Sequence, residues 1–173
     1  MSPEEIVRFW DLQNLRRWTR EDIATVAIPA SAKAFLVEVG MPVQDGWSLR
    51  FDPEADVLPR LSPQSTYRRF GFDYEVRLCL DEARDGAVIA VDIVDTVAPA
   101  GGQWYVNRDV VRFGACLVYY EQYRAAALAT SEAEIEAVIS ATEKLIRVED
   151  PTAFEDANSW WPSIIQQMNH GLL

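Results

Sequence analysis

The residue types that most often carry enzyme chemistry are scarce in this sequence. The single histidine, His170, lies near the end of the chain, where a frayed terminus holds a catalytic group poorly. Without a second histidine, no Ser-His-Asp or Cys-His arrangement can be built elsewhere. Cys79 and Cys116 stand 37 positions apart, whereas a zinc site needs cysteines or histidines in spaced pairs. We therefore expect no catalytic residues, no cofactor and no metal ligands, and hence a protein that is not an enzyme.

Two other patterns bear on chemistry with phosphates or paired acids. Gly101-Gly102 is the one glycine pair, and no Lys-Ser or Lys-Thr follows it, so a phosphate-binding loop is not indicated. Asp92 and Asp95 are candidate paired carboxylates, but residues three positions apart on a strand point to opposite faces. We interpret them as the end of a strand and the start of a turn. A carboxylate-based enzyme stays open as the least favoured reading.

Acidic residues dominate the charge. Sixteen Lys and Arg against 27 Asp and Glu give a formal net charge of −11. Phosphate-backbone binding needs clustered cations, so we expect no direct contact with nucleic acid. A basic protein partner suits this charge better.

One segment concentrates the acids. Between residues 131 and 156 there are eight of them: Glu132, Glu134, Glu136, Glu143, Glu149, Asp150, Glu155 and Asp156. At 100° per residue, Glu132, Glu136 and Glu143 fall within about 40° of one another on a helix. They form either a solvated helix face, with Glu143 paired to Arg147, or a negative patch that meets a positive partner.

Composition and length favour one soluble domain. The chain has 173 residues, 49% of them apolar and 25% charged, which is ordinary for a globular protein, and we expect one domain over 1–173. Residues 1–5 show neither the early cations nor the apolar run of a secretory signal. No window reaches the ~18 continuous apolar residues of a transmembrane helix. We therefore expect a cytoplasmic protein without membrane contact.

Helical patterns occupy both ends of the chain. Ser2-Pro3-Glu4-Glu5 combines a capping box with a first-turn proline, and Thr19 with Asp22 predicts a second, short helix. Apolar spacing predicts a helix over 30–39, which a glycine and a proline end. Asn107 is the expected N-cap of a buried helix after the strands.

Two more helices are expected towards the C-terminus. Ser131 with Glu134 forms a capping box for the first, and Asn158 or Ser159 starts the second, which a glycine ends. The buried stripe of the first is expected to hold Ile135, Val138, Ile139, Leu145 and Ile146.

Strand patterns fill the middle of the chain. Trp47, Leu49 and Phe51 alternate with polar residues, as in a half-buried strand. Asp85-Gly86 predicts a hairpin, while the proline-rich stretch 52–66 and residues 96–102 have loop composition. The other expected strands are 67–72, 76–80, 87–94 and 103–106. The order of helices, strands and helices predicts an α+β fold, with a mostly antiparallel sheet of about four to six strands.

The six tryptophans are expected to divide between core and surface. Trp10, Trp47 and Trp104 fall on apolar faces of predicted elements, which favours core packing. Adjacent helical residues point about 100° apart, so one of Trp160 and Trp161 can be buried while the other meets a partner.

Four stretches of the sequence share their order and spacing with a known family. They are Phe35-Leu36-Val37-Glu38-Val39-Gly40-Met41-Pro42, the unit from Val76-Arg77-Leu78-Cys79-Leu80-Asp81 to Asp85-Gly86-Ala87-Val88, Trp104-Tyr105-Val106-Asn107 with the helix after it, and the final segment from Trp160 to Leu173. Together these stretches resemble the SUKH superfamily of immunity proteins, in particular the fourth SUKH family. The resemblance spans residues 35–173 and departs from the family at Arg108, where a small residue is usual. It implies an α+β fold with a curved antiparallel sheet, no catalytic residues, and binding of a toxin domain, often a nuclease or a deaminase acting on nucleic acid.

The resemblance and the residues agree on a binding protein. We expect an immunity protein that occludes a basic toxin stoichiometrically, without chemistry of its own. The alternative is a SUKH-like scaffold or regulatory protein with a different protein partner, and the oligomeric state is left open. The expected partner-binding residues are Glu132, Glu136, Glu143, Asp92, Asp95 and Trp161.

Overall fold

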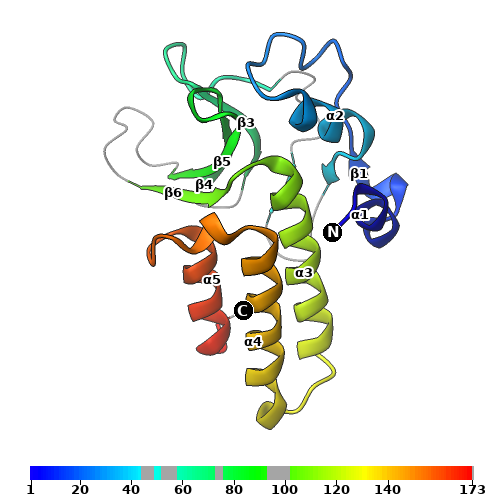
Figure 1. Ribbon diagram of the computed structural model, residues 1–173, viewed down its shortest axis with the longest axis vertical. Helices are drawn as coiled ribbons and strands as arrows, with labels where there is room; N and C mark the ends of the chain where they lie inside the picture. The colour runs from blue at the N-terminus through cyan, green and yellow to red at the C-terminus, as the bar shows by residue number, and fades with distance from the viewer. Residues whose placement is uncertain (44–48, 52–57, 73–75, 93–101, 173) are drawn as a thin grey trace.

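A four-stranded antiparallel sheet packs against a layer of helices (Figure 1). The computed structural model describes residues 1–43, 49–51, 58–72, 76–92 and 102–172. The strands follow the chain in the order β3-β4-β5-β6, and a two-stranded sheet pairs β1 with β2. The strands are β1 (Leu15–Arg16), β2 (Met41–Pro42), β3 (Tyr67–Phe72), β4 (Val76–Asp81), β5 (Ala87–Asp92) and β6 (Gln103–Asn107).

The described residues form five α-helices, of which α3 and α5 pack on the strands β5 and β6. The two longest, α3 and α4, form an antiparallel hairpin that extends past α5 and α1 in Figure 1. The helices are α1 (Pro3–Trp10), α2 (Ala30–Glu38), α3 (Val110–Ala127), α4 (Glu132–Glu149) and α5 (Trp160–Asn169). Short 3₁₀ helices are η1 (Leu12–Asn14), η2 (Glu82–Arg84) and η3 (Pro151–Phe154).

Helix α3 lies at the centre of the core. Its Phe113 contacts Phe51 and Phe70, with ring centroids 6.1 and 6.0 Å away, so one aromatic cluster joins the helix to β3 and to the segment 49–51. Helix α2 packs closely on α3, because a Cβ on Gly114 would lie 2.7 Å from the Phe35 ring. Side chains alternate between the two faces of the sheet. The inward residues join this core, and the outward ones form a second cluster of Cys79, Ala87, Ile89 and Val91.

The expected α+β fold is confirmed, with helices before and after an antiparallel sheet. The capping box of α1 is present, α2 spans most of 30–39, and Ser159 is the N-cap of α5. The strands expected at 67–72, 76–80 and 103–106 form, and the strand expected at 87–94 begins at Ala87. The Asp85-Gly86 hairpin also forms, with η2 in its connection and both residues at positive φ.

The expected helix from Thr19 is wrong. Thr19 and Asp22 exchange the hydrogen bonds of a capping box, but the segment that follows consists of turns. Successive i to i+3 backbone hydrogen bonds close these turns separately, which lets Ile23, Val26 and Ile28 all reach the core.

The expected N-cap at Asn107 is also wrong. Asp109 caps α3, its side chain accepting from the Arg112 N–H at 2.9 Å, whereas Asn107 ends β6 and is fully buried. The cap thus lies two residues later than expected, because β6 extends to Asn107 and α3 begins at Val110.

Smaller differences concern the other expected strands and the tryptophans. In the strand expected around Trp47, Leu49 and Phe51, Arg50 forms only an isolated bridge with Phe72. Trp47 lies outside the described residues, as do 93–94 of the expected strand 87–94 and residues 52–57 and 96–101 of the expected loops. Trp10 and Trp104 are only partly buried. Of the two described tryptophans in the first half of the chain, Trp18 is the buried one, and sequence reasoning missed it.

Candidate partner-binding surface

Asn107 is the centre of a buried polar network. Its Nδ2 donates to Asp150 Oδ2 at 2.9 Å, and its Oδ1 accepts from the Trp161 indole N–H at 2.9 Å. Nδ2 also lies 3.5 Å from the Cys116 sulfur. One side chain therefore joins β6 to α3, to the end of α4 and to α5.

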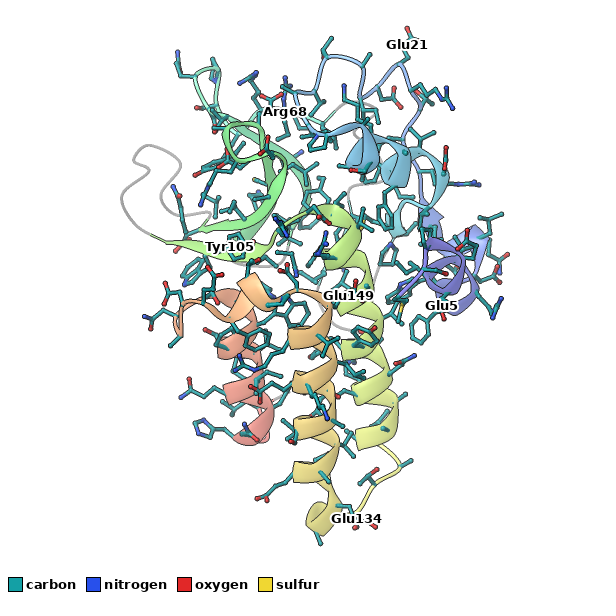
Figure 2. The ribbon with its side chains drawn as sticks, viewed as in Figure 1. Glu5, Glu21, Arg68, Tyr105, Glu134 and Glu149 are labelled. Atoms are coloured by element: carbon teal, nitrogen blue, oxygen red, sulfur yellow. The ribbon has the colours of Figure 1, made fainter. Side chains whose placement is uncertain are left out.

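Asp150 completes the network from the residue after α4. Its carboxylate is fully buried and accepts from the Arg108 N–H at 2.8 Å, and from the backbone and hydroxyl of Thr152 at 3.2 and 2.5 Å. The Thr152 hydroxyl is in turn 2.7 Å from the Tyr105 hydroxyl, so η3 is fixed beneath β6 (Figure 2). A buried carboxylate that accepts this many hydrogen bonds is satisfied without a cation.

Trp161 does not have the partner-binding role expected for it. Its side chain is 1% exposed and packs on Tyr120, while its indole N–H is taken by Asn107. A residue at this place holds α5 on the core and presents no surface. Its neighbour Trp160 is the partly exposed member of the pair.

Only part of the acidic segment faces solvent. Glu143 pairs with Arg147 at 2.7 Å, which confirms the expected i, i+4 ion pair. Glu149 binds the N-terminal ammonium of Met1 at 2.7 Å, and Asp150 is buried. Glu132 begins α4, but its side chain lies outside the description. The exposed acids are Glu134, Glu136, Glu155 and Asp156.

The remaining expected residues belong to the sheet. Asp92 ends β5 half-buried, with its N–H donating to the Gly102 carbonyl at 2.8 Å. Asp95 lies outside the described residues. The described members of the expected partner-binding set thus come from β5, α4 and α5.

The groups capable of chemistry are placed away from one another. Both thiols are buried, and burial raises the pKa of Cys79 to about 12 and also raises that of Cys116. His170 is exposed at the end of α5. Among the described residues, no three of the His, Cys, Asp and Glu side chains are grouped as a metal site would require. Within the described part of the chain, no helix has the length and apolar character needed to cross a membrane.

A second polar cluster serves the fold. The Glu82 carboxylate accepts from Arg60 at 2.7 Å, from Arg68 at 3.0 Å and from the Ala27 N–H at 2.9 Å. Burial acts to raise the pKa of Glu82, but these hydrogen bonds and cations outweigh it and lower the pKa. The cluster ties the sheet to the residues before α2.

A groove between α3 and α4 forms an open apolar surface. It encloses about 340 Å³, and none of its lining residues is charged. We call it the hairpin groove, and its lining residues are Tyr119, Gln122, Tyr123, Ala137, Val138, Ala141, Thr142 and Leu145. Sequence reasoning missed it because Leu145, placed in the buried stripe, is 45% exposed.

Comparison with known proteins gives one match. The family model described as SUKH-4 immunity protein matches residues 1–167. Neither the curated proteins nor the solved structures include a match to the chain. Because the family match spans nearly the whole sequence, the chain belongs to the SUKH-4 immunity protein family.

Proposed function

We propose that this protein protects a bacterial cell by binding a cognate toxin domain and covering its active site, in a stoichiometric complex. The observation that carries the proposal is the family match over residues 1–167. Immunity requires recognition of the toxin and no chemistry, which suits a chain whose described thiols are both buried. We place the neutralisation in the cytoplasm.

The toxin is proposed to be basic and to act on nucleic acid, as a nuclease or a deaminase. An enzyme that handles a phosphate backbone carries clustered cations. The immunity protein carries a net charge of −11, so long-range attraction favours their encounter.

The proposed contact is the acidic flank of α4, which we define as Glu132, Glu136 and Glu143. Glu136 is exposed, and Glu143 forms an ion pair with Arg147. Charges at such a rim act mainly on the association rate and its salt dependence. Asp92, at the end of β5, and Asp95 are kept as proposed secondary contacts.

The test uses the toxin domain encoded beside this chain and a triple variant, Glu132→Gln, Glu136→Gln and Glu143→Gln. The control variant changes three exposed acids elsewhere, Glu4, Glu21 and Glu38, to glutamine, so both variants lose the same charge. The acidic-flank variant is expected to associate roughly tenfold more slowly at low salt, with little change in dissociation.

Two results would overturn parts of the proposal. Equal association rates for the two triple variants would move the contact away from α4 while leaving toxin binding intact. Absence of any complex between the wild-type chain and the toxin domain, together with no protection of growth on co-expression, would contradict the function itself.

A further inference from the structure

An arginine, a carboxylate and an aromatic ring meet at the last turn of α4. The Arg147 guanidinium donates from Nε and from Nη2 to Oε1 of Glu143, at 2.8 and 2.7 Å. Its central carbon lies 3.9 Å from the centroid of the Phe154 ring. Phe154 belongs to η3, which follows α4 where the chain turns back into α5 (Figure 1). One guanidinium is therefore held by two groups from different elements.

These two contacts are the ones by which proteins recognise arginine. A guanidinium is planar and always charged, so it can stack on an aromatic ring while its edge donates to a carboxylate. A lysine ammonium is a compact, strongly hydrated charge that cannot stack in this way. We call the Glu143 carboxylate and the Phe154 ring the arginine cradle, which in the free chain holds Arg147.

The arginine cradle lies at the surface of the protein. The side chains of Arg147 and Glu143 are 50% and 30% exposed, and Phe154 is half-buried against the core. An exposed ion pair and an exposed cation–π contact each change an equilibrium constant by about fivefold at most. Arg147 can therefore leave the cradle at low cost, because an arginine that replaces it forms the same two contacts.

The charge around the arginine cradle favours a basic partner. Glu136 is exposed and lies on the same side of α4, within about 20° of Glu143 at 100° per residue. Glu155 directly follows Phe154 and is also exposed. An arginine that enters the cradle thus has acids near it on both α4 and the segment after η3, which attract a basic protein surface.

We infer that the arginine cradle binds an arginine side chain of the cognate toxin, which displaces Arg147. The inference rests on the proposed function for the identity of the partner, and it names the residue type that the acidic flank of α4 recognises. In the free chain, Arg147 pairs with Glu143 and covers the Phe154 ring. It therefore competes with the toxin for the same site.

The first experiment needs no toxin. Hexa-arginine and hexa-lysine carry equal charge, and each is titrated into the full chain at low salt while NMR follows the Phe154 ring and the Glu143 amide. Arg147→Gln empties the cradle. Lys144→Gln, about 60° round α4, removes the same charge and leaves the cradle occupied. Arg147→Gln is expected to bind hexa-arginine at least about threefold more tightly than Lys144→Gln does, and the two variants are expected to bind hexa-lysine equally.

Phe154 supplies the second control. When Phe154→Leu is combined with Arg147→Gln, the extra affinity for hexa-arginine is expected to disappear, while the affinity for hexa-lysine stays unchanged. Circular dichroism checks that each variant is folded. If Arg147→Gln is unfolded, Arg147→Lys repeats the test, because lysine keeps the charge but occupies the cradle more weakly than arginine.

The toxin domain encoded beside this chain then identifies the occupant. Arg147→Gln is expected to bind it about fivefold more tightly than Lys144→Gln does. Equal affinity of the two variants for hexa-arginine, or a gain that hexa-lysine shares, would overturn the inference, because Arg147 would then only fasten η3 to α4. Equal affinity of the two variants for the toxin would overturn the assignment of a toxin arginine to the cradle. A wild-type chain that binds no toxin would contradict the proposed function, and the peptide titrations would still decide whether the cradle recognises arginine.

Discussion

Replacing Asn107 with alanine is expected to destabilise the protein far more than the loss of a helix cap. The substitution leaves the Trp161 indole N–H without its acceptor and removes one of the donors to the buried Asp150 carboxylate. An unsatisfied buried donor costs about 1–3 kcal/mol, and a lost hydrogen bond to a charged group about 1.5–3 kcal/mol. We therefore expect the free energy of unfolding to fall by about 3–5 kcal/mol.

The matched control is Asp109→Ala, which removes the actual N-cap of α3. Loss of a cap costs about 1 kcal/mol, so this variant should lie well above Asn107→Ala in stability. Urea unfolding followed by tryptophan fluorescence measures both, and thermal unfolding should separate them by roughly 10 °C in Tm. Equal losses of about 1 kcal/mol in the two variants would refute the reasoning, because Asn107 would then act only as a local cap.

Three other substitutions or treatments give separate tests. Glu82→Gln removes the partner of Arg60 and Arg68 and is expected to cost about 2–3 kcal/mol at pH 7. Because folding lowers the pKa of Glu82, its stabilisation is present above the ordinary carboxyl pKa and is lost as the pH falls through the pKa of the folded state. Urea unfolding at several pH values measures the difference in stability between Glu82→Gln and wild type. A difference that does not shrink in acid would contradict this prediction. Iodoacetamide should modify the buried thiols of Cys79 and Cys116 roughly 100-fold more slowly in the native protein than in urea at pH 8, because burial raises their pKa. Mass spectrometry measures the labelling, and rapid labelling of the native protein would contradict this prediction. Asp92→Asn should leave protection against the toxin intact, since binding spreads over a surface; if it abolished protection while the complex still formed, Asp92 would have a chemical role.

Local signals in the sequence were sufficient for most helices and strands. The capping box at Ser2, the glycine after α2 and the Asp85-Gly86 turn each act within a few residues, so pattern and structure agree there. Thr19 shows the limit of such signals. Its side-chain hydrogen bonds with Asp22 form as expected, but tertiary packing of the following apolar residues replaces the helix with turns.

The network around Asn107 could not be predicted because its members are distant in the sequence. Asp150 and Trp161 follow Asn107 by 43 and 54 positions and meet it only when α4 and α5 pack on the sheet. Contacts between distant positions also explain why not all of the acidic segment faces solvent. Glu149 pairs with the N-terminal ammonium, and Asp150 is buried in the core. Helical periodicity was sufficient to predict the helix that carries Glu136 and Glu143, because that pattern depends on one helix alone.

The most direct test of immunity by occlusion is a titration of the toxin domain's activity with this protein, at toxin concentrations well above the dissociation constant. Stoichiometric binding predicts that activity falls linearly and reaches its minimum at one chain for each toxin. A toxin silenced by far less than one equivalent would contradict occlusion, because the protein would then act catalytically. A toxin that stays fully active in an excess of this protein would contradict the proposal that the protein neutralises it.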